Sequence, residues 1–208
     1  MIKRTLSICI LLCLNITVIT ASETEDNTFG GWTFIDATHN FKNGLYIKDH
    51  LEHDNYQYSR MECWYNRFCL GYSILPWLKT NLNYVLDREP GYWMHCLEAD
   101  VAGTLKSGNL KVNLRERFQR SWTPEQGTAS NAFRTLFKVS YHIPDSKFGI
   151  YLAPEIFIKN KEWNKTRHYI GCTYSITDFM EFDGYYMYYA FRNKPDESVI
   201  GLGFNFNF

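Results

Sequence analysis

The sequence predicts an all-β fold: a transmembrane, antiparallel, up-and-down β-barrel of about 10–12 strands that follows a cleaved signal peptide. Three observations lead to this prediction. Apolar and polar residues alternate with a period of two along much of the chain, which is typical of strands with one apolar and one polar face. Short turn segments alternate with longer polar segments, as they do in outer-membrane barrels. The last predicted strand carries an aromatic residue, Phe208, at its end.

The N-terminal segment has the pattern of a secretory signal peptide. Lys3 and Arg4 precede an apolar run that reaches Ile19, and the small residue Ala21 follows ahead of a polar, acidic stretch. This order predicts cleavage after Ala21. An uncleaved anchor is the weaker alternative, because the run is shorter than the ~20 residues of a spanning helix. The predicted division is a signal peptide at residues 1–21 and one outer-membrane barrel domain at residues 22–208.

Alternation also predicts where the strands lie. It is clearest in residues 110–119, 133–141 and 148–158, where apolar side chains interleave with charged and polar ones. The predicted strand segments are 32–39, 44–53, 57–71, 78–87, 92–105, 109–120, 131–142, 147–159, 166–175, 179–191 and 198–208. Bacterial single-chain barrels normally have an even number of strands. The segments therefore predict ten to twelve strands rather than a fixed count.

The connectors predict that the two ends of the barrel differ. Short turns are expected at residues 40–44, 73–77, 105–109, 142–147 and 175–179, and longer polar loops at 52–57, 86–91, 121–131, 159–166 and 192–198. Outer-membrane barrels have short periplasmic turns and longer external loops. The longer segments are therefore expected to face outward from the cell.

The last segment, residues 198–208, is predicted to close the barrel. In lipid the backbone has to pair with itself, so this strand is expected to pair with an early one. Its aromatic signature, Phe204, Phe206 and Phe208, is expected on the outer face, with the asparagines between them facing inward. Phe208 is expected in the aromatic girdle at the periplasmic interface. We also expect the barrel-assembly machinery to bind this C-terminal strand.

Ionisable residues on the polar face of the strands predict a charged lumen. The predicted lumen charge network consists of Glu98, Asp100, Arg115, Arg117, Arg134, Lys138, Glu155, Arg167, Glu181 and Asp183. Charges of both signs inside a narrow barrel have to pair with one another or with water. Two residues break the strand pattern. Glu116 falls on the apolar face, and Pro154 predicts a bulge because proline cannot donate to the ladder.

Four cysteines follow the predicted cleavage site: Cys63, Cys69, Cys96 and Cys172. None of them forms a C-x-x-C pair, and we expect them to lie singly on outward faces as small apolar residues, with their disulfide state left open. Charge is balanced at 22 basic and 22 acidic residues, so it gives no reason to expect a nucleic-acid partner.

Four stretches carry a resemblance to a known family. They are "LKVNLRERFQRSW", "RTLFKVSYHIPDSKFGIYLAPEIFI", "RHYIGCTYSITDFMEFDGYYMYYAF" and "VIGLGFNFNF". They are similar to an uncharacterised outer-membrane β-barrel family, catalogued as domain of unknown function twenty-four-ninety. The similarity extends back to "GGWTFIDATHNF", so it covers most of the chain. It implies a barrel in the outer membrane of a Gram-negative cell and no known activity, so no catalytic residue is carried over.

No catalytic residue, metal site or cofactor is predicted. The stretch "DHLEHD" at residues 49–54 contains possible cation ligands, but His50 and His53 point to opposite faces of a strand. A lipid-modifying site at the rim would draw on Ser130, Glu162 and His168. Such a site has to be assembled across strands, and no local signature such as G-x-S-x-G is present.

The sequence therefore predicts a porin-like outer-membrane protein that is monomeric, contacts outer-membrane lipids, and has either a structural role or that of a narrow pore with a charged lumen. Three alternatives stay open. The chain would bind a ligand through its external loops, modify lipids at its rim, or, as the least favoured alternative, act as a soluble lipocalin-like binder. An enzyme is less favoured than a protein without catalytic activity.

Overall fold

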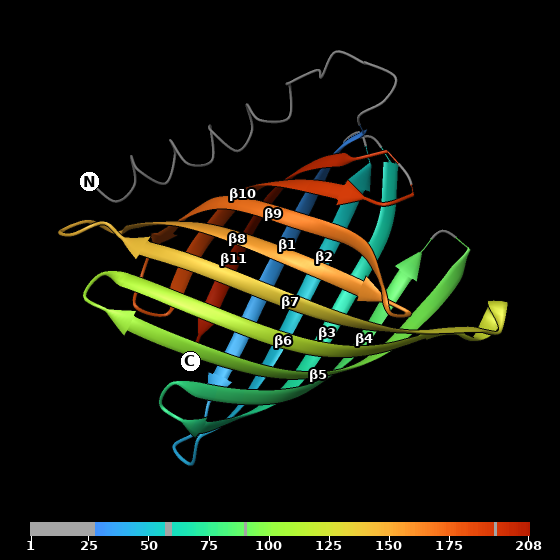
Figure 1. Ribbon diagram of the computed structural model, residues 1–208. Helices are drawn as coiled ribbons and strands as arrows, with labels where there is room; N and C mark the ends of the chain where they lie inside the picture. Colours follow the sequence, from blue (N-terminus) through green and yellow to red (C-terminus); the bar gives the residue numbers. More distant parts are fainter. Residues whose placement is uncertain (1–27, 57–59, 90, 194) are drawn as a thin grey trace.

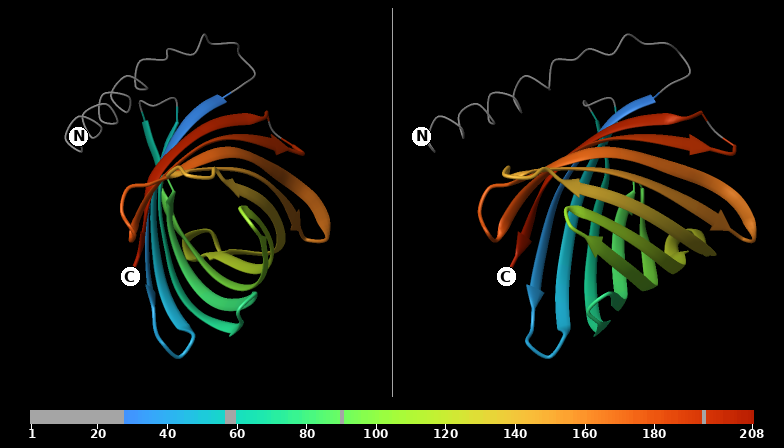
Figure 2. Two further views of the ribbon diagram at one scale, coloured as in Figure 1. Left: turned by 90° about the vertical axis from the view of Figure 1, so that its left-hand side faces the viewer. Right: turned by 60° about the vertical axis from the view of Figure 1, so that its left-hand side comes forward.

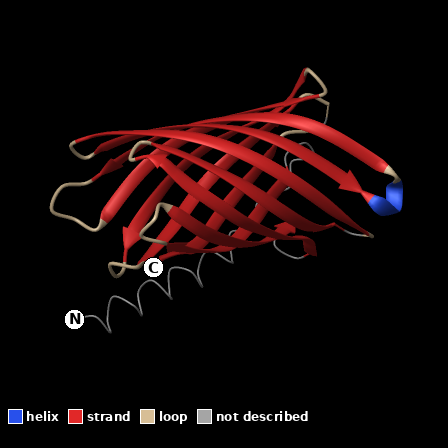
Figure 3. Ribbon diagram, turned by 90° about the horizontal axis from the view of Figure 1, so that it is seen from below, coloured by secondary structure: helices blue, strands red, loops and turns tan. Residues whose placement is uncertain are grey.

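The computed structural model describes residues 28–56, 60–89, 91–193 and 195–208, which form one closed barrel of eleven strands (Figure 1). The strands are β1 (Thr28–Asn40), β2 (Leu45–Tyr56), β3 (Arg60–Leu75), β4 (Leu78–Glu89), β5 (Tyr92–Ser107), β6 (Leu110–Thr123), β7 (Thr128–His142), β8 (Phe148–Lys159), β9 (Glu162–Ser175), β10 (Met180–Phe191) and β11 (Glu197–Asn207). A short 3₁₀ helix, η1 (Pro124–Gln126), lies at one end of the barrel (Figure 3). No helix among the described residues is long and apolar enough to cross a membrane. The predicted signal peptide lies outside the described residues.

The barrel closes through a parallel pair. Each strand pairs antiparallel with its neighbour in sequence, and β1 pairs parallel with β11, from Thr28 opposite Glu197 to Thr38 opposite Asn207. The parallel pair follows from the odd strand number, because eleven alternating strands leave the first and last pointing the same way. Eleven strands fall within the predicted range, and closure of the last strand on an early one is confirmed. We call the two rims the Thr28 end and the Phe208 end.

The outer surface of the barrel is apolar. Every strand exposes large apolar side chains, of which Leu105 on β5 is the most exposed at 70%. The inner face is polar, and Asn83, Glu98 and Asp100 are buried there. An apolar exterior around a polar interior is the arrangement of a barrel surrounded by hydrocarbon. A soluble lipocalin-like barrel needs the opposite polarity, with apolar side chains inside.

Inward-facing glycines leave room for aromatic rings. The pairs that face one another across neighbouring strands are Gly71 with Tyr46, Gly171 with Tyr151, Gly201 with Tyr185, and Gly203 with Phe34. A Cβ atom added at Gly201 would lie only 2.0 Å from Cζ of the Tyr185 ring. Only glycine allows so close an approach, and this explains the glycines at positions 201 and 203 on the inner face of β11.

The prediction of longer loops at one end is wrong. The longest connectors have five residues, and one lies at each end: 143–147 at the Phe208 end and 192–196 at the Thr28 end. In the segment 159–166, Asn160 and Lys161 both have left-handed backbone, with φ values of 52° and 70°. Such a two-residue turn matches the twist of a hairpin, so the strands continue almost to the turn.

A second predicted loop, residues 121–131, is also mostly strand. β6 continues to Thr123 and β7 begins at Thr128, joined through η1 and Gly127 at φ 61°. Polar composition alone suggested a loop here. The polar residues instead belong to strand ends that project from the barrel.

The bulge predicted at Pro154 is absent. Between β7 and β8 the register is the same on both sides of the proline, from Leu136 opposite Glu155 to Val139 opposite Leu152, with no pairing in between. On the other side Pro154 pairs regularly with His168. The missing N–H therefore interrupts the ladder toward β7 without inserting a residue.

The cysteines differ from the prediction as well. Cys63, Cys69 and Cys96 are buried inside the barrel, and only Cys172 is exposed. All four are free thiols. The prediction of outward faces is wrong for three of them. A small side chain fits the crowded inner face, where neighbouring positions hold long charged residues.

Candidate functional site

The barrel encloses a cavity of about 630 Å³ that receives side chains from all eleven strands. Its lining runs from Glu89 and Glu197, at the Thr28 end, to Lys138 and Asp183, nearer the Phe208 end. Figure 2 shows the ring of strands that surrounds it. This lumen is the candidate functional site because it gathers most of the buried charge of the described residues.

A chain of ionised side chains, here called the belt, follows the inner wall from β3 to β9. Its members are Arg67 on β3, Glu98 and Asp100 on β5, Arg115 and Arg117 on β6, Arg134 on β7, Glu155 on β8 and Arg167 on β9. All of them occupy inward positions, on β3 and on the five consecutive strands β5 to β9. This placement brings each carboxylate within reach of arginines from neighbouring strands.

Glu98 is the first centre of the belt and is 3% exposed. Its Oε2 lies 3.2 Å from Arg67 Nε and 2.8 Å from Arg117 Nη1. Both contacts are ion pairs without hydrogen-bond geometry. Arg134 approaches the other oxygen at 3.7 Å, and the buried amide of Asn83 donates to Oε2 at 3.1 Å. A buried carboxylate with this many partners is compensated for the water it has lost.

Glu155 is the second centre and is 1% exposed. Its Oε1 accepts hydrogen bonds from Arg115 Nη2 at 2.6 Å and from Arg134 Nε at 3.1 Å, and it lies 3.0 Å from Arg134 Nη2. Arg167 Nη1 is 4.0 Å from Oε2. Three guanidinium groups from three strands therefore converge on one carboxylate.

Asp100 completes the belt by binding Arg117 in a bidentate manner, with Nε and Nη2 each 2.6 Å from a carboxylate oxygen. The belt then holds five guanidinium groups against three carboxylates, a formal excess of two positive charges. Bidentate arginine pairs are geometrically specific and rigid. The belt is thus a fixed, positively biased strip along the inner wall of the barrel.

The structure places seven of the ten predicted network residues in the belt, and the other three lie toward the Phe208 end. There, Tyr151 donates to Asp183 at 2.9 Å, and Lys138 Nζ lies 3.5 Å from the centre of the Tyr151 ring. Glu181 accepts from Asn205 at 3.5 Å. These residues form separate pairs rather than an extension of the belt.

Sequence reasoning missed a second polar cluster on β1 and β2. Asp36 lies 2.8 Å from both Lys48 Nζ and His50 Nδ1, and His50 Nε2 lies 3.4 Å from Glu52. Arg67 of the belt was missed as well. The period-two pattern of β1, β2 and β3 would have revealed these residues, since each one shares its face with other inward-facing positions. His53 does not line the cavity, in agreement with the opposite faces expected for the two histidines.

An aromatic wall faces the belt. It consists of Trp32 and Phe34 on β1, Tyr169 on β9, and Tyr185 and Tyr189 on β10. Met187 and Val199 are buried next to these rings. Arg167 joins the two sides, because its guanidinium lies 5.0 Å from the Trp32 ring and 4.5 Å from the Tyr189 ring. Cation–π contacts of this kind hold the arginine against the aromatic wall.

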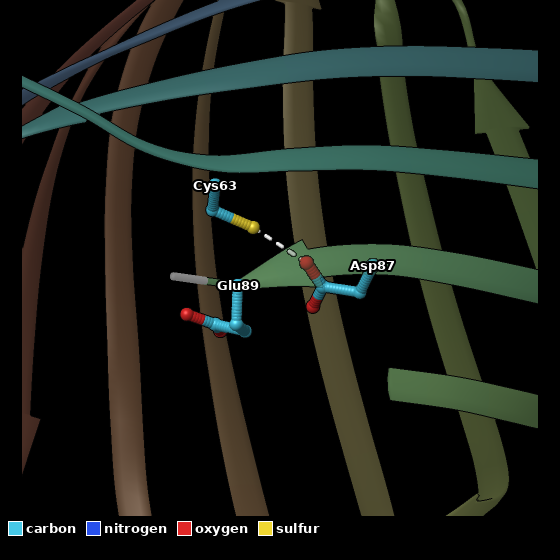
Figure 4. Close-up of side chains that lie close together, drawn as sticks. All are labelled: Cys63, Asp87 and Glu89. Carbon is cyan, nitrogen blue, oxygen red and sulfur yellow. Dashed lines mark hydrogen bonds between the residues drawn. The ribbon is translucent and has the colours of Figure 1, made fainter. Parts of the chain in front are cut away.

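Cys63, Asp87 and Glu89 lie together near the Thr28 end, where Figure 4 shows the thiol of Cys63 pointing at Asp87. Their ligand atoms all fall within 4.8 Å of one another, and Cys63 Sγ donates to Asp87 Oδ1 at 2.5 Å. These are the groups that could hold a cation in the described part of the chain. A cation bound here would have to displace the proton that the thiol donates to Asp87. The expectation that no metal is bound stays a prediction.

The residues considered for a rim enzyme are not brought together. His168 is exposed on the outer face and its Nε2 is 3.2 Å from Thr166 Oγ1. Glu162 pairs with Arg192 at 2.5 Å, whereas Ser130 lines the lumen. Within the described ranges, no hydrogen bond connects these three residues.

Comparison with solved structures places the barrel among porin-like folds. The chain is similar to a NanC porin, at 14% identity and a TM-score of 0.58, over 83% of this chain and 91% of that one. It is also similar to a KdgM porin, at 10% identity and a TM-score of 0.50, over 77% and 84%. A KdgM porin in complex with disordered oligogalacturonate matches over the same shares, at 10% identity and a TM-score of 0.51. Identities this low establish the fold only.

Sequence comparison gives the family. No curated protein matches the chain. The model of the family described as "Protein of unknown function (DUF2490)" matches residues 29–199, most of the chain, and the chain therefore belongs to this family, as the sequence predicted.

Proposed function

We propose that this protein is an integral barrel of the outer membrane of a Gram-negative cell and forms a narrow, water-filled pore for small polar solutes. The observation that carries the proposal is the cavity of about 630 Å³, which is lined by charged side chains and enclosed by a closed barrel with an apolar exterior. Ionised groups keep water in a lumen because they are costly to desolvate. The fold likeness to two proteins named as porins supports a pore over a purely structural role.

The proposed pore passes between the belt and the aromatic wall, which both line the cavity. Belt charges are bound to one another at 2.6–4.0 Å, so a passing ion competes with partners that are already in place. Such neighbours attract each other by about 4 kcal/mol at an effective dielectric constant near 20. The paired side chains of the belt therefore stay in position and restrict the width of the lumen. Tyr185 and Phe34, held in place by their facing glycines, limit it from the other side.

The proposed partners follow from the two faces of the barrel. Outer-membrane lipids contact the apolar exterior, and the barrel-assembly machinery binds the C-terminal strand through Phe204, Phe206 and Phe208. The backbone of Phe208 pairs with β1, since its N–H donates to Thr38 at 2.8 Å and its carbonyl accepts from Asn40 at 2.9 Å. The protein is proposed to be a monomer without a cofactor. Binding through external loops has less support, because connectors of at most five residues offer little surface.

The test is single-channel conductance of refolded protein in a planar bilayer, with folding confirmed by a heat-dependent shift on a detergent gel. We expect steady, discrete openings. Tyr185→Ala removes a ring from the aromatic wall. Because a wider lumen conducts more ions, the conductance should rise by roughly 1.5- to 2-fold. Tyr186→Ala is the matched control, because Tyr186 is the next residue of β10 and points outward. A folded protein that stays silent in both forms would refute the pore.

A further inference from the structure

Two arginines of the strands point away from the lumen. They are Arg88 on β4 and Arg120 on β6, each close to the Thr28 end of its strand. The residues next to them in sequence, such as Asp87 and Gln119, line the cavity, and side chains alternate along a strand. Every other strand arginine whose side chain the structure describes belongs to the belt. The lumen charges therefore do not account for this pair.

Each of the two guanidinium groups is held by a neutral neighbour. That of Arg88 lies 5.0 Å from the centre of the Trp93 ring, and on its other side Arg88 lies opposite Trp64 of β3. Arg120 Nη1 donates to Asn131 Oδ1 at 3.0 Å. Neither arginine forms an ion pair with any residue that the structure describes. Both charges therefore lack a compensating acid within this part of the chain.

Aromatic side chains lie on the surface between the two arginines. His95 is opposite Trp122, with the two rings stacked at 5.6 Å, and Tyr84 Oη is 2.6 Å from His95 Nδ1. By the spacing of residues and strands, the Cα atoms of Arg88 and Arg120 are about 16 Å apart. We call this surface the basic patch, and it consists of Trp64, Tyr84, Arg88, Trp93, His95, Arg120, Trp122 and Asn131.

Toward the middle of the barrel, the basic patch continues into an apolar surface. Leu97 lies opposite Arg120 and is 54% exposed, and the rings of Phe118 and Phe133 pack against each other at 5.2 Å. The first acid along the outward face of β6 is Glu116, about 13 Å from Arg120 by the spacing of strand residues. The exterior thus offers positive charge near the Thr28 end, next to a broad apolar surface.

A lipid with a phosphorylated headgroup has the complementary arrangement. The planar fork of arginine binds phosphate oxygens in a bidentate manner, and tryptophan prefers the interface between headgroups and acyl chains. Basic clusters beside the hydrocarbon region attract anionic lipids. At the Phe208 end the exposed side chains include rings such as Trp77 and Phe179, and no described strand presents an arginine outward there. The charge complementarity is thus confined to one end of the barrel.

We infer that the basic patch docks lipids with phosphorylated headgroups. The guanidinium groups of Arg88 and Arg120 bind headgroup phosphate, and the acyl chains lie along the apolar surface beside the patch. The inference rests on the proposed membrane barrel but not on the pore, and it adds a headgroup and one end of the barrel to the general contact with lipids. Because Phe208 is expected at the periplasmic interface, the bound lipid is expected in the outer leaflet.

Phosphatidic acid is the probe, because its headgroup is a bare phosphate, and phosphatidylcholine is the reference. Refolded protein is placed in phosphatidylcholine vesicles that contain either lipid with brominated acyl chains, which quench tryptophan fluorescence on contact. Trp93 and Trp122 lie in the basic patch and report its occupant. We expect phosphatidic acid to associate at least about fivefold more strongly than phosphatidylcholine, a preference that one cation near the headgroup is sufficient to give.

Substitution of the two arginines tests their role. Arg88→Gln with Arg120→Gln should reduce the preference for phosphatidic acid to less than about twofold, and each single substitution should give an intermediate value. The control is Arg192→Gln with Lys147→Gln, which removes the same net charge outside the patch. Arg192 pairs with Glu162, and Lys147 donates to a backbone carbonyl. The control should keep the full preference. The single substitutions keep the test decisive if the double variant does not fold.

Equal quenching by both brominated lipids, or an equal loss of preference in the control, would refute the docking. Inorganic phosphate distinguishes a lipid from a free anion. If it abolishes the preference and chloride at the same ionic strength does not, the arginines bind free phosphate and lipid docking is overturned. Conductance decides the pore independently. A conducting channel without the lipid preference leaves the pore in place and refutes the docking, and a silent protein that keeps the preference does the reverse.

Discussion

At mid-height the barrel fills its narrow interior in two different ways. The belt uses long charged side chains that neutralise one another, centred on Glu98 and Glu155. The aromatic wall uses rings that fit over glycines, such as Tyr185 over Gly201. The comparison teaches that a polar lumen does not need uniform packing. In the belt each charged side chain packs against a side chain of opposite charge. In the aromatic wall a ring packs over a glycine, which has no side chain to occupy the space.

The belt should be the more fragile of the two when a single residue is lost. Glu155→Ala leaves Arg115, Arg134 and Arg167 facing one another without their shared carboxylate. We expect the free energy of unfolding to fall by about 3–5 kcal/mol, as is typical when one partner of a buried ion pair is removed. The measurement is urea unfolding of detergent-folded protein, followed by tryptophan fluorescence.

Glu155→Gln serves as the matched variant, because it keeps the shape and one accepting oxygen while removing the charge. It should lose less stability than Glu155→Ala. A loss below about 1 kcal/mol in the alanine variant would mean that water replaces the carboxylate, and that the belt is an open, hydrated surface.

The aromatic wall should be sensitive to added atoms instead. Gly201→Ala introduces a methyl group where the Tyr185 ring lies, so either the ring or the strand has to move. We expect a loss of about 1–3 kcal/mol, as in overpacked cores, together with a lower conductance as the ring is pushed into the lumen. Gly103→Ala is the control, since nothing lies within 4 Å of an added Cβ there. A control that loses as much stability as Gly201→Ala would contradict the fit of ring over glycine.

The smallest effect is expected on the outer face, where Glu116 extends the comparison. This carboxylate is exposed among apolar side chains and accepts from Thr135 at 2.8 Å. Glu116→Leu should stabilise the barrel by about 1 kcal/mol in detergent or lipid, because a lipid-facing acid is mildly unfavourable. Glu125→Leu, in the exposed helix η1, should change little. A destabilised Glu116→Leu variant would indicate that another molecule holds the carboxylate, which would contradict the expected monomer.

Much of the fold could be predicted because strand alternation is a local property. Ten predicted segments overlap their strands closely, and even the first, 32–39, lies inside β1. Connector length was harder to predict, because polar residues at strand ends look like loops. The backbone of Asn160 and Lys161 forms a tight turn that composition does not reveal. The face of the strand on which a residue lies was predictable wherever apolar and polar residues alternate strictly. Tyr185 lines the lumen and Tyr186, the next residue, is exposed on the outer face.

The candidate site, like the fold, could be predicted from the sequence only in part. By itself the sequence determined which residues share a face of a strand, because side chains alternate along a strand whatever surrounds it. Only the tertiary structure decided which of them meet, since register and closure bring Glu155 to Arg115, forty positions away in the chain. The same holds for the aromatic wall, which joins side chains of β1 to side chains of β9 and β10. These segments meet only once the sheet closes and the parallel pair of β1 and β11 completes the ring.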